Sequence, residues 1–127
     1  MVSEAILNLN FPILSTKVSD LCALASKIIN YNFYCAENFN PELIEHLVLN
    51  IAENYNVLSY HNFSHAFSVF LMLYQCKNKS AELHNCYSSF EFFIAYISAL
   101  CHDMNHKGTN SAYEIKKKTD LAIKYNN

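Results

Sequence analysis

The chain has 127 residues and a mass of 14.6 kDa, which is enough for one domain and excludes two of ordinary size. Hydrophobic residues make up 52% of it and charged residues 16%, so the chain can bury a sizeable core and general disorder is excluded. The formal net charge is -2 and arginine is absent, which excludes the basic surface of a nucleic-acid-binding protein.

Glycine and proline are scarce, with one and two residues respectively. Sandwiches, barrels and doubly wound folds need glycine in their tight turns, so this scarcity favours helices joined by loops. Asparagine is abundant and adopts left-handed backbone more readily than most residues, so some asparagines could replace glycine, although A/T-rich codon usage explains their number more simply. We therefore predict an all-α fold.

The cysteines and the apolar segments indicate the cellular compartment. The chain has five cysteines, an odd number, without any C-x-x-C spacing, which predicts a reducing environment. Residues 1–17, interpreted as an N-terminal extension, carry Glu4 and Asn8 where a secretory signal would be apolar. The longest apolar stretch, residues 90–101, is interrupted by Glu91 and is too short to span a bilayer. We expect an intracellular, cytoplasmic protein with no membrane segment in this chain.

The first two helices are predicted from the spacing of apolar residues. Ser19 is a candidate N-cap for a helix that runs to about Ile29, with apolar positions every three or four residues. Asn40 and Pro41 supply an N-cap and a first-turn proline to a second helix, whose apolar stripe extends to Tyr55.

A third helix should begin near Asn62 or Ser64 and end at about Tyr74. His61 and His65 are four residues apart, so they share one face if this helix begins by His61. The following residues 77–88 are polar and are predicted to form a loop with room for one helical turn.

A fourth long helix follows Ser88, which can form a capping box with Glu91. Its positions up to Cys101 are apolar nearly all round, which predicts a place in the centre of a bundle. Gly108, the only glycine, suits a C-cap just beyond this helix. A last helical stretch is expected over roughly residues 111–125.

Four of the six histidines fall into two clusters, His61 with His65 and His102 with His106, and Asp103 follows His102 directly. Imidazoles at i and i+4 can converge on a cation, as in the H-E-x-x-H pattern of zinc enzymes. Either pair alone is more simply explained as surface or hydrogen-bonded core histidines. Their conjunction is more specific, because one cluster follows an apolar helix and the other opens one. Imidazole nitrogens with a bridging carboxylate suit Zn²⁺ beside Mg²⁺ or Mn²⁺, which makes a two-metal hydrolase plausible.

Three segments together resemble the catalytic domain of class I cyclic nucleotide phosphodiesterases. Residues 60–66 resemble its Y-H-N-x-x-H-A signature, residues 102–110 resemble its H-D-x-D-H-x-G-x-N segment, and the run from Asp120 to Asn126 is also similar. The resemblance covers residues 18–127 and is faint before Tyr55. It implies an all-α, compact multi-helix bundle of the HD type, which hydrolyses cAMP or cGMP to the 5′-monophosphate in cyclic nucleotide signalling.

The same resemblance assigns roles residue by residue. His65, His102 and Asp103 match ligands of a zinc-type ion, with Asp103 bridging to a second, magnesium-type ion. His61 matches the general acid that protonates the departing O3′, and His106 matches a histidine near the second ion and the phosphate. The implied cofactors are therefore two divalent ions, Zn²⁺ with Mg²⁺ or Mn²⁺, and the implied partner is a cyclic nucleotide. A homodimer of the full-length protein is also compatible with the resemblance.

The chain departs from the family pattern in three residues and in length. Asn105 stands where Asp is usual, Lys107 replaces Pro or Arg, and Ser111 replaces Asn. None of these changes removes a direct ligand. The family's domain continues well beyond Asn127, so we expect residues 18–127 to be its N-terminal half, incomplete at the C-terminus and inactive alone.

Two alternatives remain open from the sequence. One is another HD-type metal phosphohydrolase, against which the Tyr60-His61-Asn62 block argues, because generic members lack it. The other is a non-catalytic truncated fragment, whose histidines are relics or core groups. The preference between cAMP and cGMP cannot be assigned from these residues.

Overall fold

The computed structural model describes residues 11–33 and 40–125, and within these ranges the regular structure is helical, without strands. Cys35, Asn126 and most of the predicted N-terminal extension lie outside the described residues. A short 3-10 helix, η2 (Ile13–Ser15), is followed by seven α-helices in the described ranges. Their bounds are α1 (Val18–Phe33), α2 (Pro41–Glu53), α3 (Phe63–Lys79), α4 (Ala81–Cys86), α5 (Ser89–Cys101), α6 (Ser111–Lys117) and α7 (Asp120–Tyr125).

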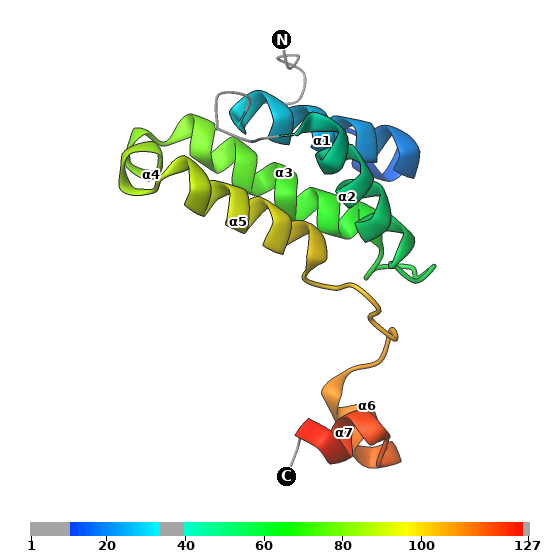
Figure 1. Ribbon diagram of the computed structural model, residues 1–127. Coiled ribbons are helices and arrows are strands. Elements are labelled where there is room, and N and C mark those ends of the chain that lie inside the picture. Colours follow the sequence, from blue (N-terminus) through cyan, green and yellow to red (C-terminus); the bar gives the residue numbers. More distant parts are fainter. Residues whose placement is uncertain (1–10, 34–39, 126–127) are drawn as a thin grey trace.

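Helices α1 to α5 form one body, in which α3 packs side by side with α5 on one side and with α1 on the other (Figure 1). The core is formed by apolar side chains from four of these helices, and burying such side chains is the main stabilising contribution to a fold of this kind. Its largest fully buried members are Leu21, Ile28, Ile29, Val48, Phe67, Phe70, Tyr96 and Leu100. The all-α expectation is therefore confirmed.

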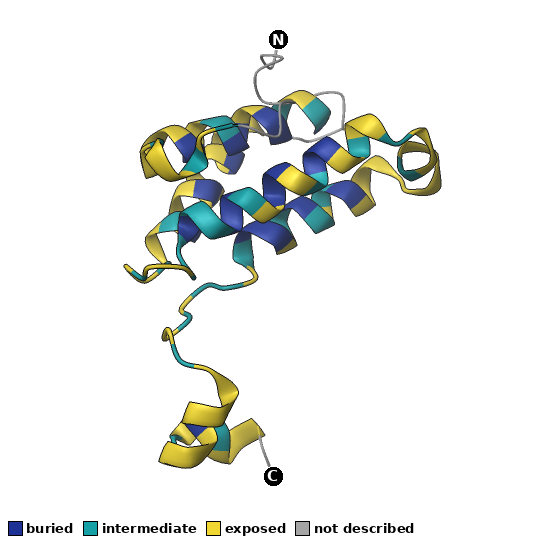
Figure 2. Ribbon diagram, turned by 180° about the vertical axis from the view of Figure 1, so that it is seen from behind, coloured by how far each residue is buried: buried dark blue, intermediate teal, exposed yellow. Residues whose placement is uncertain are grey.

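Helices α6 and α7 lie apart from this body, at the far end of an extended segment that begins after α5 (Figure 1). Most of their surface is exposed (Figure 2). The predicted single helical stretch over residues 111–125 is broken, because Lys118 adopts a left-handed conformation with φ 48°. Its N–H bonds back to the carbonyls of Glu114 and Ile115, which closes the end of α6.

Two helix starts are confirmed in detail. The Asn40 side chain accepts hydrogen bonds from the backbone N–H groups of Glu42 and Leu43, with Pro41 as the first residue of α2. The Ser88 hydroxyl accepts from the Glu91 backbone N–H while the Glu91 carboxylate accepts from the Ser88 N–H, which completes the capping box of α5.

Other helix boundaries differ from the sequence-based expectation. Helix α1 begins before Ser19, which is not its N-cap, and it continues past Ile29 because Phe33 packs edge-on against Phe93, with ring centroids 5.3 Å apart. Residues 77–88 are largely helical rather than a loop. The end of α3 is held by Lys77, whose Nζ lies 4.7 Å from the centroid of the Phe92 ring.

Two further expectations about α5 are wrong. The helix lies at the side of the body rather than in its centre, because Phe90 and Ile94 are 69% and 49% exposed. Gly108 is not its C-cap, since α5 ends at Cys101 and the C-cap is His102, which has a right-handed conformation. Gly108 instead forms a later turn with φ 79°, where a Cβ atom would lie 3.0 Å from Leu58 Cδ2.

Candidate metal centre

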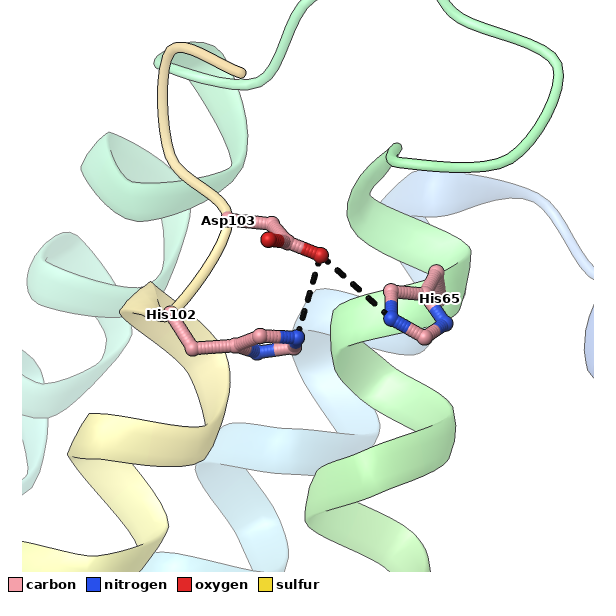
Figure 3. Close-up of side chains that lie close together, drawn as sticks. All are labelled: His65, His102 and Asp103. Atoms are coloured by element: carbon pink, nitrogen blue, oxygen red, sulfur yellow. Dashed lines mark ion pairs between the residues drawn. The ribbon is translucent and has the colours of Figure 1, made fainter. Parts of the chain in front are cut away.

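Three of the predicted site residues, His65, His102 and Asp103, meet at one end of the α3–α5 pair (Figure 3). Asp103 Oδ2 lies 3.4 Å from His65 Nε2 and 3.1 Å from His102 Nε2. One donor atom from each residue lies within 4.8 Å of the other two. Ligands about 2.0–2.2 Å from a tetrahedral ion lie roughly 3.4 Å apart, so this spacing suits one shared divalent ion. We call these three residues the His-His-Asp triad.

His65 is presented by the first turn of α3. Asn62 is the N-cap of this helix, and its side chain accepts a hydrogen bond from the His65 backbone N–H at 3.1 Å. The Asn62 amide also donates to the Leu58 carbonyl at 2.8 Å, which fixes the orientation of the capping group. The Y-H-N block therefore determines where α3 begins and where the His65 side chain lies.

The His102 ring is oriented by its second nitrogen. Nδ1 lies 2.8 Å from the Ala99 carbonyl oxygen in the last turn of α5. A carbonyl can only accept, so Nδ1 carries a proton, and the nitrogen left to bind a metal is Nε2, which lies 3.1 Å from Asp103 Oδ2. Metal-binding histidines in proteins are commonly held by this type of second bond. The donor set of the triad thus fits a divalent ion.

The electrostatics of the triad favour a neutral His65. Burial lowers the pKa of His65, and the neighbouring His102 and His61 lower this pKa further, while the Asp103 carboxylate opposes them. A lowered pKa means that the unprotonated imidazole, which is the form that binds metals, predominates at neutral pH.

The remaining two predicted residues form a second pair beside the triad. The rings of His61 and His106 are stacked, with centroids 3.9 Å apart and planes at 17°. His106 Nδ1 accepts a hydrogen bond from the Gly108 backbone N–H at 2.9 Å, so the proton of the neutral ring resides on Nε2. His61 precedes Asn62, the N-cap of α3, so the condition under which His61 and His65 would share a helical face is not met.

Tyr60 connects the pair to the triad. Its ring centroid lies 4.9 Å from that of His61 and 4.6 Å from that of His65. All five predicted site residues are thus brought together, although His65 and His106 line different hollows. A hollow of about 550 Å³ adjoins His65 beside residues 11–15, and another of about 700 Å³ separates His106 from α6 and α7.

Sequence reasoning missed three consecutive residues that connect the two halves of the site. Asn54, Tyr55 and Asn56, which follow α2, each bond to the segment that carries His102, Asp103 and His106. We call them the 54–56 clamp. Tyr55 was predicted only as part of an apolar stripe, and nothing in the local pattern identifies hydrogen bonds to residues about fifty positions away.

Comparison with known proteins identifies a family for these segments. Residues 60–127 match the sequence model described as 3′5′-cyclic nucleotide phosphodiesterase. The chain is 37% identical over 76 residues to a protein of Drosophila melanogaster named high affinity cGMP-specific 3′,5′-cyclic phosphodiesterase 9A, covering 60% of the chain. It is 33% identical over 89 residues to the protein of the same name from Mus musculus, covering 70% of the chain. A cGMP-specific 3′,5′-cyclic phosphodiesterase of Drosophila virilis is 33% identical over 78 residues, or 61% of the chain.

The matched segments are short relative to these proteins. They span 5%, 16% and 9% of the lengths of the Drosophila melanogaster, Mus musculus and Drosophila virilis relatives, respectively. Among the described helices of this chain, none combines the length and the apolar character needed to cross a membrane.

Proposed function

This chain belongs to the 3′,5′-cyclic nucleotide phosphodiesterase family, and on that premise we propose that the protein hydrolyses a 3′,5′-cyclic nucleotide to the 5′-monophosphate. Water adds to phosphorus, the bond from phosphorus to O3′ breaks, and O3′ takes up a proton. The relatives named above are cGMP-specific, so cGMP is the first substrate to test, with cAMP as the comparison. Residues 18–127 would then form part of the catalytic domain.

The observation that carries the proposal is the geometry of the His-His-Asp triad. Its two imidazole nitrogens and one carboxylate oxygen suit Zn²⁺, and we propose that Asp103 also contacts a second ion, Mg²⁺ or Mn²⁺. Such ions, when bound, supply a water molecule of lowered pKa and offset the negative charge that develops on the phosphoryl oxygens.

The pair His61–His106 supplies the proton chemistry in this proposal. His61 is assigned as the general acid for O3′, because it lies beside the triad without belonging to it. His106 stacks against His61 and is itself oriented by the Gly108 N–H, so it can hold the His61 ring in place and approach the phosphate through Nε2. Proton donation by a positioned histidine accelerates reactions by roughly 10² to 10⁴.

The cysteines support an intracellular, cytoplasmic setting for this activity. Within the described ranges, Cys22, Cys76, Cys86 and Cys101 are free thiols. Structural disulfides are rare in reducing compartments, so free cysteines agree with a role in intracellular signalling.

Two substitutions separate the proposed roles. His61→Ala should lower kcat for cGMP hydrolysis by roughly 10² or more while the bound metal is retained, because a general acid acts in the transition state without holding the ion. Asp103→Ala should lower both metal content and kcat, since it removes one ligand and the proposed bridge. Turnover, and metal content by elemental analysis, should be measured on the longest protein that the reading frame encodes.

Three outcomes would revise the proposal. If His61→Ala loses metal as completely as Asp103→Ala does, His61 is a ligand and the division of roles is wrong. Turnover that is unaffected by either change would refute the catalytic assignment. Metal binding without hydrolysis of cGMP or cAMP would instead favour a non-catalytic product or an HD-type phosphohydrolase with another substrate.

A further inference from the structure

The proposed metal site is assembled from two segments that lie far apart in the chain. His65 belongs to the start of α3, whereas His102 and Asp103 follow the end of α5. The last four carbonyls of a helix have no partner within the helix, so bonds from outside the helix are what fix its end. An additional connection is therefore needed to hold the end of α5 against the start of α3.

The Tyr55 hydroxyl supplies the central part of this connection. It donates to the Leu100 carbonyl in the last turn of α5 at 2.8 Å, and it accepts from the Asp103 backbone N–H at 3.2 Å. One oxygen atom thus pairs with a carbonyl that has no partner within the helix. The same atom orients Asp103, the residue of the triad that lies close to both histidines. The Tyr55 ring also lies edge-on to Phe63, the first residue of α3, with centroids 5.9 Å apart.

The neighbours of Tyr55 extend the connection along the same segment. The Asn54 carbonyl accepts a hydrogen bond from the Asn105 N–H at 3.0 Å, and the Asn56 amide donates to the His106 carbonyl at 2.8 Å. Asn105 has φ 58°, a left-handed conformation that asparagine tolerates better than most residues. The 54–56 clamp therefore holds the backbone on both sides of Asp103.

We propose that Tyr55 is a positioning residue for the metal centre, which sets the separation between His65 and Asp103. Its hydroxyl joins the Asp103 backbone to the end of α5, and its ring packs against the start of α3. This inference rests on the proposed metal site, and it adds a residue that touches neither metal nor substrate. Without the hydroxyl, the Asp103 N–H and the Leu100 carbonyl both lose a partner, so the carboxylate is free to move relative to the two imidazoles.

The test compares Tyr55→Phe with a matched control, Tyr96→Phe. Both substitutions remove one hydroxyl from a tyrosine packed in the body, but the buried Tyr96 hydroxyl has no hydrogen-bond partner among the described residues. Co²⁺ alone is the probe, because its visible absorption reports coordination number and its titration gives a dissociation constant. Each variant of the 127-residue chain is titrated with Co²⁺, and helicity and thermal unfolding of the metal-free protein are recorded by circular dichroism.

We expect Tyr55→Phe to alter the visible spectrum and to weaken Co²⁺ binding by about tenfold. This loss of affinity is at the lower end of what is usual for residues that orient metal ligands. Tyr96→Phe should leave both unchanged. If Tyr55→Phe lowers the unfolding temperature but keeps the wild-type dissociation constant and spectrum, its role is purely structural and the positioning proposal is overturned. Wild-type protein that binds no Co²⁺, or binds it equally after His102→Ala, would overturn the metal site itself.

Discussion

The body formed by α1 to α5 and the α6–α7 segment are both helical, yet they are stabilised in different ways. The body buries apolar side chains from four helices around Phe67, Phe70 and Tyr96. In α6 and α7 the buried residue is a carboxylate, Glu114, while most other side chains there are exposed (Figure 2). Packing therefore stabilises the body, whereas polar bonds stabilise α6 and α7.

Glu114 is the centre of those polar bonds. The hydroxyls of Thr109 and Thr119 each donate a hydrogen bond to its carboxylate, one from before α6 and one from after it. These bonds hold the turn at Lys118 and bring α7 against α6. The two regions should therefore respond differently to the same kind of change.

The largest expected effect is on the packed body. Phe70 is fully buried, with ring centroids 5.8 Å from Phe67 and 5.3 Å from Tyr96, so Phe70→Ala should lower the free energy of unfolding by about 3–5 kcal/mol. Ile115 in α6 is 49% exposed, and Ile115→Ala should change the free energy by less than about 0.5 kcal/mol. Chemical denaturation followed by circular dichroism measures both. Equal losses would refute the contrast between packed and unpacked helices.

Acidification should act on α6 and α7 first. Hydrogen bonds from Thr109 and then Thr119 hold the pKa of Glu114 below its ordinary value of 4.5, with burial opposing them. A carboxyl whose folded pKa is lowered contributes stability that is fully present above pH 4.5 and is lost as pH falls through the lowered pKa. We expect the protection factors of the amides of residues 111–125, which compare observed with intrinsic exchange rates, to fall over that interval while those of α3 and α5 stay high.

Glu114→Gln provides the control for this experiment. The amide removes the titrating group, so the protection factors of residues 111–125 should be lower at neutral pH and should no longer fall as the pH drops below 4.5. The same steep acid dependence in the variant would show that another group is responsible.

The smallest expected effect concerns helix caps. Ser88 caps α5 and Asn110 caps α6, each accepting a hydrogen bond from the first turn. Ser88→Ala should lower the global free energy of unfolding by about 1 kcal/mol, because α5 unfolds together with the body. Asn110→Ala should leave global unfolding unchanged and increase only the local exchange of α6. A drop in global stability from Asn110→Ala would mean that α6 is coupled to the body.

Local signals in the sequence predict the fold where neighbouring residues determine it. The cap at Asn40, the proline at 41 and the capping box at Ser88 each depend on residues within one helical turn, and all three are confirmed. The end of α3 could not be predicted in this way, because Lys77 is held by the Phe92 ring from another helix. The break at Lys118 likewise depends on the contacts of Glu114 with flanking threonines.

In the functional site, too, local motifs predict which residues take part, whereas contacts between distant segments could not be predicted. The motifs at residues 60–66 and 102–110 identified the five side chains that the fold brings together. The family resemblance also grouped His65, His102 and Asp103 as one ligand set, whereas the distances between them depend on how α3 and α5 pack. The hydrogen bonds of Tyr55 in the 54–56 clamp could not be predicted either. Their partners are backbone groups, which are the same in every residue and leave no pattern in the sequence.

The metal centre can be tested by a Zn²⁺ titration of the 127-residue chain by isothermal calorimetry, with His65→Ala and the matched control His46→Ala. His46 is an exposed histidine in the middle of α2 and lies outside both clusters. We predict a Zn²⁺ site in the wild type that His46→Ala retains and His65→Ala loses or weakens by more than tenfold. Equal binding by all three proteins, or no binding by the wild type, would contradict the assignment of His65, His102 and Asp103 as a metal centre.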